Sequence, residues 1–166
     1  AKALDRHSEV GLAGPTLRDR QGRRQASTWR DMTLADVLLD LSFLTPLARL
    51  MGFVTPVELP ERAEAGPVPN LSGAAMMARR ETLLALEGFD TSLFWIEDRD
   101  LCLRVRKLGL EVWQVPEAVV HHIGGHSARR NLRVSLGNQL FNKIRWYRRH
   151  GSKREVAIVT LATGFH

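Results

Sequence analysis

The feature that most restricts the fold of this chain is a short amphipathic helix followed at once by strand-like sequence. Leu101, Val105 and Leu108 share one face of a helix predicted over 98–108, and Gly109 supplies its stop. Two apolar runs, 111–115 and 118–122, then have the character of strands on either side of a Pro-Glu pair. A helix that leads directly into strands indicates an α/β protein.

Helical and strand-like segments alternate along the rest of the chain. The sequence predicts the end of a helix at 1–10, a buried strand at 10–17 and a polar loop at 23–30. A Leu-rich helix that Pro46 kinks or ends is predicted over 34–51, a strand over 71–78, and a short helix before Gly88 over 81–87. The α/β class fits this alternation. The strands are too few for a complete doubly wound sheet, so we expect part of a larger domain.

Positive charge is concentrated toward the C-terminus. The chain has 24 Lys and Arg against 18 Asp and Glu, a net charge of +6, and 128–154 alone carries nine Lys or Arg and no acid. Apolar residues at helical spacing predict an amphipathic helix over 131–150: Leu132, Leu136, Leu140, Ile144 and Tyr147. Such a patch attracts nucleic acid, anionic lipid or phosphorylated substrates, and a solvated basic helix explains it equally well.

The remaining composition is that of a globular protein, with 44% hydrophobic and 25% charged residues. Cys102 is the only cysteine, which excludes an intramolecular disulfide and fits a reducing compartment. No apolar run approaches the roughly 20 residues that cross a bilayer. The range 55–69 holds four prolines and several acids, so we expect a mobile surface loop there.

Three acids surround the start of the predicted helix at 98–108. The positive end of the helix dipole favours Glu97, Asp98 and Asp100 at this place, which is a purely structural explanation of the cluster. Chemically, a carboxylate within hydrogen-bond reach can take a proton from a hydroxyl group. Like charges raise the pKa of such a group and the dipole lowers it, and the sequence leaves that balance open.

Two histidines and a glycine-rich turn follow the last strand-like run. Alternation along a strand points His121 and His122 to opposite faces, so one of them can face a given site. The turn that follows, Gly124-Gly125-His126-Ser127, permits close backbone approach to a ligand, and Arg129 and Arg130 behind it could hold a diphosphate. Trp95 could stack on a sugar face or fill the core.

The ordered set of motifs resembles a known enzyme family. In chain order the motifs are Ser72-Gly73-Ala74-Ala75-Met76-Met77-Ala78-Arg79-Arg80, Gly88-Phe89-Asp90, Phe94-Trp95-Ile96-Glu97-Asp98-Arg99-Asp100-Leu101-Cys102-Leu103-Arg104, Val115-Pro116-Glu117-Ala118 and His121-His122-Ile123-Gly124-Gly125-His126-Ser127. Together they resemble the second half of bacterial family 2 glycosyltransferases, which have the GT-A fold, especially the rhamnosyltransferase-like and galactofuranosyltransferase-like members. The segments 10–15 and 19–23 resemble the region after that family's nucleotide site.

The resemblance implies a role for each of these residues. It implies an inverting sugar transfer from a nucleotide-diphosphate sugar, with Asp98 as the catalytic base and with Glu97 and Asp100 positioning or tuning it. It implies His122, in preference to His121, as a ligand of a divalent cation, Mn²⁺ or Mg²⁺. The substrate-binding residues expected on the same ground are Gly73, Trp95, Gly124, Gly125, His126, Ser127 and Arg129.

The resemblance also implies the organisation of the chain. We expect the acceptor-side, C-terminal half of a GT-A domain over 1–127, with a partial mixed sheet and flanking helices. A basic amphipathic helix and an apolar tail, the start of a membrane-associated helix, are expected over 128–166. The nucleotide-binding half and its Asp-x-Asp motif are expected before Ala1, so this chain alone should be inactive.

The implied acceptor is a lipid-linked or cell-surface glycan precursor, as in cell-wall and polysaccharide synthesis. We expect a cytoplasmic protein, peripheral at the inner face of the cell membrane, with the arginines of 128–154 free to meet anionic headgroups. Two alternatives remain: a basic binding module for nucleic acid or anionic membrane, and a catalytically inactive fragment. Trp146 and Tyr147 lie within the patch, but no nucleic-acid signature is present, so specific nucleic-acid binding is not expected.

Overall fold

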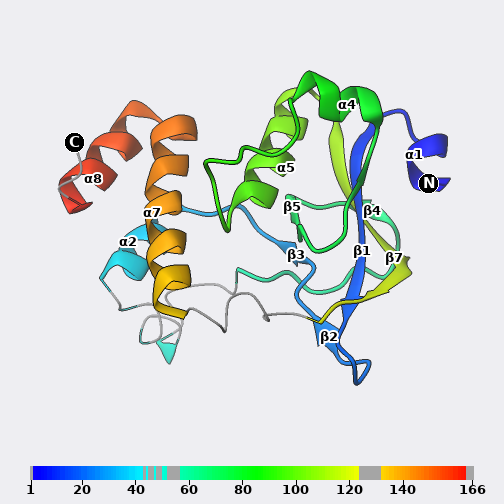
Figure 1. Ribbon diagram of the computed structural model, residues 1–166, viewed down its shortest axis with the longest axis horizontal. Helices are drawn as coiled ribbons and strands as arrows, with labels where there is room; N and C mark the ends of the chain where they lie inside the picture. The colour runs from blue at the N-terminus through cyan, green and yellow to red at the C-terminus, as the bar shows by residue number, and fades with distance from the viewer. Residues whose placement is uncertain are drawn as a thin grey trace.

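The computed structural model describes residues 2–42, 44, 47, 50–51, 57–123 and 132–163. The described part is a mixed α/β protein in which helices flank a five-stranded mixed sheet and a second, two-stranded sheet (Figure 1). Its helices and strands are α1 (Lys2–Arg6), β1 (Val10–Arg18), β2 (Arg24–Gln25), β3 (Thr28–Trp29), α2 (Leu34–Leu41), β4 (Gly66–Pro67), β5 (Asn70–Leu71), β6 (Met77–Ala78), α4 (Arg80–Ala85), α5 (Glu97–Lys107), β7 (Glu111–His121), α7 (Leu132–His150) and α8 (Lys153–Thr163).

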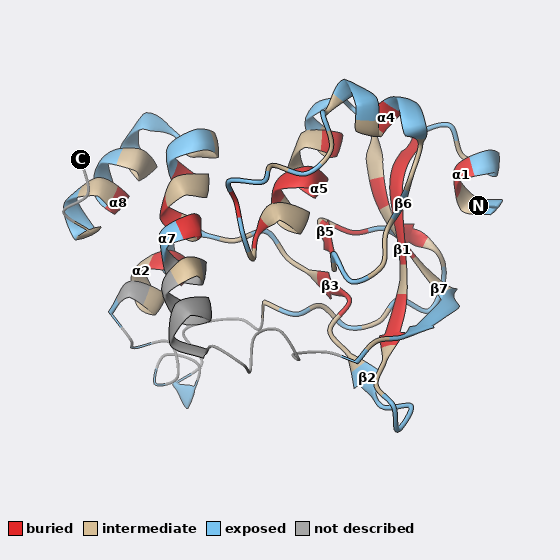
Figure 2. Ribbon diagram, in the orientation of Figure 1, coloured by how far each residue is buried: buried red, intermediate tan, exposed pale blue. Residues whose placement is uncertain are grey.

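The two long strands, β1 and β7, run parallel at the centre of the main sheet. Strands β2 and β6 pair with β1, and β4 pairs with β7, all antiparallel. Most of β1 is buried, as Figure 2 shows: Leu12 packs against α5, and Val10 and Ala13 pack with Leu4 of α1. This explains why β1 is a continuous apolar run instead of an alternating one.

The sequence predicted two strands after the helix at 98–108, and the structure has one. Strand β7 runs through both predicted segments, with an irregular register at Pro116. Pro15 lies opposite Val115, but the next residue, Thr16, lies opposite Val119. Since proline has no N–H for the ladder, residues 116–118 form a bulge and pairing resumes beyond it.

Helix α5 packs on the sheet as the sequence predicted. Leu101 and Val105 are buried with Leu12 and Val112 of the central strands, and Gly109 ends the helix with a φ of +79°. Leu108, which was expected on the same face, is half exposed. Cys102 joins this core, and burial raises the pKa of its thiol to about 12, so the thiol stays protonated and inert at neutral pH.

A second hydrophobic cluster joins α2, α7 and α8. Its buried residues are Val37, Ile144, Tyr147 and Val159. Ile144 and Tyr147 confirm the predicted inner face of α7, and Val159 shows that part of the apolar tail is packed against the protein. Helix α2 thus packs with the C-terminal helices. No helix within the described ranges has the length and apolarity needed to span a bilayer.

Three predicted segments differ in detail from the structure. Helix α2 begins with a capping box between Thr33 and Asp36 and ends at Leu41, before the predicted break at Pro46, and Leu47 and Leu50 are again helical. The expected strand at 71–78 is interrupted by a turn at 73–75 that separates β5 from β6, and the expected loop at 23–30 contains β2 and β3. Within the proline-rich range, Glu61 bonds Thr16 and Arg18, which anchors that segment to β1.

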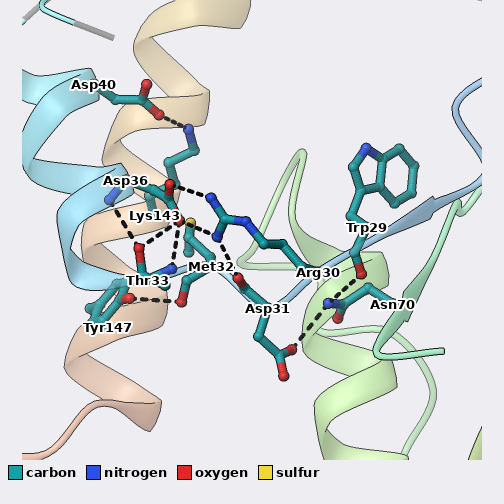
Figure 3. A network of polar contacts seen from close by, with 10 residues as sticks. All are labelled: Trp29, Arg30, Asp31, Met32, Thr33, Asp36, Asp40, Asn70, Lys143 and Tyr147. Carbon is teal, nitrogen blue, oxygen red and sulfur yellow. Dashed lines mark hydrogen bonds and ion pairs between the residues drawn. The ribbon is translucent and has the colours of Figure 1, made fainter. Parts of the chain in front are cut away.

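A polar network connects the two clusters at the segment before α2 (Figure 3). Arg30 forms a two-pronged ion pair with Asp36, with both N···O distances 2.7 Å. Burial disfavours the ionised form of Asp36, but hydrogen bonds from Arg30 and Thr33 outweigh it and lower the pKa to about 2. The hydroxyl of Tyr147 donates to the Met32 carbonyl at 2.9 Å, so α7 is fixed to the same segment.

Candidate active site

The expected base, Asp98, lies in the first turn of α5 beside the turn that follows β5. The backbone N–H of Gly73 donates to Asp98 Oδ2 at 3.0 Å, and the N–H of Arg99 donates to Oδ1 at 2.7 Å. A Cβ atom at position 73 would lie 3.3 Å from Asp98 Cβ, closer than most real contacts. The glycine therefore lets the backbone approach this carboxylate, which gives Gly73 a positioning role next to the expected base.

Burial is the largest influence on the acidity of Asp98. It raises the pKa of this half-buried carboxyl, while the N–H groups of Gly73 and Arg99 and the charge of Arg99 act in the opposite direction without reversing the change. The balance that the sequence left open is thus decided by desolvation. A carboxylate with a raised pKa is a stronger base, which suits proton removal from a hydroxyl group.

Next to Asp98, two buried polar atoms have no hydrogen-bond partner among the described residues: Glu97 Oε2 and Trp95 Nε1. Burial, and secondarily the charge of Asp98, raises the pKa of Glu97. Trp95 has a φ of +80°, a conformation that costs a bulky residue on the order of 1–3 kcal/mol. Unpaired buried groups and local strain together are typical of a place where a ligand binds.

Asp100 occupies a different environment from Asp98. Its side chain is 1% exposed and forms ion pairs with Arg104 Nε and His150 Nε2, both at 2.6 Å. Arg104 also donates to the carbonyls of Leu86 and Gly88 at the end of α4. Both oxygens of Asp100 are therefore engaged in ion pairs, which give this residue a structural role that holds α5 to its neighbours.

Helix α7 holds the loop that leads into the site. Arg149 pairs with Asp90, Arg145 Nη1 donates to the Ser92 carbonyl at 2.6 Å, and Asn142 Nδ2 donates to the Phe94 carbonyl at 2.7 Å. These three side chains lie at i, i+3 and i+7 on one face of α7, whereas Ile144 and Tyr147 face the second cluster. The expectation that the arginines of this helix are free was wrong for Arg145 and Arg149, because the loop before α5 binds them.

The histidine pair lies at the opposite end of β7 from its start after α5. His121 is exposed, with Nδ1 3.1 Å from the Asp19 carbonyl, and half-buried His122 has Nδ1 3.1 Å from Gln25 Oε1. No three His, Cys, Asp or Glu side chains gather into a metal-binding group within the ranges that the structure describes. The described neighbours of His122 therefore do not make up a metal site. Gly124, Gly125, His126, Ser127 and Arg129 lie outside the described residues.

Two residues beside Asp98, Arg99 and Trp29, were missed by the sequence interpretation. Arg99 follows Asp98 in the first turn of α5, and its guanidinium lies over the ring of Trp29, with Cζ 5.4 Å from the ring centroid. A signal was present in the sequence, since a basic residue is disfavoured at the positive end of a helix. Trp29 gave no such signal, because nothing in the sequence placed β3 next to α5.

Comparisons of the chain with protein-family models, with curated proteins and with solved structures give no match. The fold and the site define a mixed α/β protein with a desolvated carboxylate held by backbone N–H groups at the start of a helix. Any more specific function has to be argued from that geometry.

Proposed function

We propose that this chain carries the catalytic base of an inverting glycosyltransferase with a GT-A fold, and that the base is Asp98. The single observation that supports it most is the state of this carboxylate: burial raises its pKa, and the Gly73 N–H fixes one oxygen. Among the three acids at the start of α5, Asp98 has no ion-pair partner in the described residues, unlike Asp100.

In the proposed reaction Asp98 accepts the proton of an acceptor hydroxyl group. The oxygen of that group forms a bond to the anomeric carbon of the donor sugar while the bond from that carbon to the diphosphate oxygen breaks. The nucleoside diphosphate leaves with the electron pair of that bond, and attack from the opposite face inverts the configuration. Glu97 lies beside Asp98 in the first turn of α5, where burial and the charge of Asp98 raise the pKa of Glu97 itself, and we assign it a role in positioning the base.

The substrates of this proposal follow from the family resemblance: a nucleotide-diphosphate sugar as donor and a lipid-linked or cell-surface glycan precursor as acceptor. The resemblance also includes a divalent cation, Mn²⁺ or Mg²⁺, with His122 as a ligand. No group of three His, Cys, Asp or Glu side chains surrounds His122 in the described residues, and the steps above are carried by Asp98 and its neighbours. Trp95 and Gly73 remain candidate substrate contacts at the rim of the site.

The test is a pair of asparagine substitutions in a form of the protein that transfers sugar. Asp98→Asn should lower turnover by roughly 10²- to 10⁴-fold, the scale of general-base loss, and leave donor binding nearly unchanged. Asp100→Asn should act mainly on stability, because it breaks the pairs with Arg104 and His150. Normal turnover in Asp98→Asn, together with lost turnover in a folded Asp100→Asn, would refute the assignment.

A second candidate function is binding to an anionic membrane, which accounts for a peripheral location at the inner face of the cell membrane. It is favoured by exposed apolar side chains that follow α2, Leu44, Leu47, Leu50 and Met51, and by the exposed cations Lys153 and Arg154 of α8. Each cation near such a surface contributes about 1 kcal/mol, and salt weakens it.

Flotation with liposomes, with and without anionic lipid over a salt series, tests this second candidate. Binding should require anionic lipid and should fall when Lys153 and Arg154 are replaced by Gln. Tight, sequence-selective binding to DNA or RNA at physiological salt would instead support the nucleic-acid module and exclude the membrane interpretation.

A further inference from the structure

Arg99 is an arginine without a carboxylate partner in a region where its neighbours have one. Its guanidinium forms no ion pair or hydrogen bond with any residue of the described ranges, and its contact is the face of Trp29. By contrast, three arginines nearby pair with carboxylates at 2.6–2.7 Å: Arg30 with Asp36, Arg104 with Asp100 and Arg106 with Asp31.

Two physical penalties act on Arg99 where it lies. It carries a positive charge in the first turn of α5, where the helix dipole is itself positive. It is also half-buried, and this burial lowers its pKa. The charges of Asp98, Asp36 and Asp31 raise the pKa, but they do not offset the burial. Cations at such places are usually paired with an anion. A cation that lacks one is a feature expected at functional sites.

The guanidinium of Arg99 lies over the ring of Trp29, and Arg99 is partly exposed to solvent. A cation over an aromatic ring is attracted to its face, so the ring fixes the plane of Arg99. The N–H groups of a guanidinium point outward in that plane and match two oxygens of a phosphate or carboxylate. In Figure 3 the ring of Trp29 points away from Arg30 and Asp31.

We propose that Arg99, supported by Trp29, binds an oxyanion of the acceptor, a phosphate or a carboxylate, beside Asp98. The oxyanion site rests on the contacts above, and its assignment to the acceptor rests on the proposed function. The charges of Asp98 and Arg99 act on each other, so the two groups are near enough for an acceptor whose hydroxyl group meets Asp98 to have a neighbouring group within reach of Arg99. The acceptor class is then an anionic glycan precursor, and Arg99 selects it against neutral sugars.

The oxyanion site is tested on the 166-residue chain by NMR titration with methyl phosphate and with acetate, which needs no activity. The Arg99 Nε–Hε signal should shift, while those of Arg104 and Arg106, held by carboxylates, should not. Arg99→Gln should weaken methyl phosphate binding roughly tenfold or more, the scale of a charged hydrogen bond. Arg80→Gln, which removes an exposed charge from α4, is the control and should bind as the unmodified chain does.

Two results would overturn the site: an Arg99 signal that does not move at millimolar phosphate, or equal affinities in the Arg99→Gln and Arg80→Gln variants. If Arg99→Gln fails to fold, the shift of the Arg99 signal in the unmodified chain still tests the site. Asp98→Asn should bind phosphate more tightly, because it removes a repelling charge, and a weaker affinity counts against the arrangement.

The source of the oxyanion is decided by kinetics in a form that transfers sugar. Arg99→Gln should raise KM for an anionic acceptor and leave KM for a neutral acceptor and for the donor unchanged. A raised donor KM alone would overturn the assignment to the acceptor. If no transfer occurs but phosphate still binds Arg99, the proposed function fails and the oxyanion site stands.

Discussion

The ion pair between Arg30 and Asp36 gives a stability prediction that can be worked from the structure. Asp36 is the capping residue at the third position of α2 and is 8% exposed, and its pKa falls from 3.8 to about 2 in the folded chain. Each pKa unit corresponds to about 1.4 kcal/mol, so ionised Asp36 contributes about 2 kcal/mol of folding free energy. Asp36→Asn should therefore cost about 2 kcal/mol at pH 7.

The pH dependence has a definite sign. Because the folded-state pKa is depressed, the contribution is fully present above the ordinary value of 3.8 and is lost as the pH falls through about 2. Urea denaturation of both chains at several pH values between 7 and 2.5 measures the difference in the free energy of unfolding. That difference should be constant from pH 7 to about pH 5 and should shrink below pH 4.

The control is Asp5→Asn, which removes an exposed carboxyl group from α1. This variant should match the unmodified chain at every pH within about 0.5 kcal/mol, as surface substitutions usually do. If the Asp36→Asn difference stays constant down to pH 2.5, the cost comes from packing and not from the ion pair. The Arg30–Asp36 ion pair would then not stabilise the connection between the two clusters.

Three further predictions concern the site and its supports. Gly73→Ala places a methyl group 3.3 Å from Asp98 Cβ, so turnover should fall by roughly tenfold with unchanged donor affinity, and steady-state kinetics against an Ala74→Gly control measures it. Cys102 should resist alkylation at pH 8 in the folded chain and react in urea, as mass spectrometry would show, whereas rapid labelling of folded protein contradicts its raised pKa. Asn142→Ala removes the bond to the Phe94 carbonyl, so amide exchange in 90–96 should increase, in contrast to Asn138→Ala, and an unchanged rate would show that α7 does not hold this loop.

Much of the fold could be predicted because its signals are local. The burial of β1 follows from a continuous apolar run, and the bounds of α5 follow from apolar spacing and Gly109. The apolar run at 71–78 misled the prediction, since Gly73 and its neighbours form a turn beside α5 that only the tertiary structure requires. The helix predicted over 34–51 with a kink or end at Pro46 is α2 up to Leu41, and Leu47 and Leu50 are again helical.

Contacts between distant segments could not be predicted from periodicity. The arginines of α7 were correctly placed on a polar face, but a polar face does not show whether it meets solvent or a loop. Arg145 and Arg149 meet the loop at 90–92, about fifty residues earlier in the chain. For the same reason Trp29 was missed as the support of Arg99, since β3 joins β5 and approaches α5 only in the folded chain.

The start of α5 shows why similar residues along a sequence can have unrelated roles. Successive side chains of a helix are rotated by about 100°, so neighbours in one turn face different surroundings. Asp98 faces the Gly73 turn, Arg99 faces Trp29, and Asp100 faces Arg104 and His150. The helix dipole favours both Asp98 and Asp100. Because both oxygens of Asp100 are ion-paired, that residue is structural. Asp98 is desolvated and only partly hydrogen-bonded, so it can accept a proton. The chemistry of this turn is therefore set by the three elements that meet it, and one of them, α7, belongs to the second cluster.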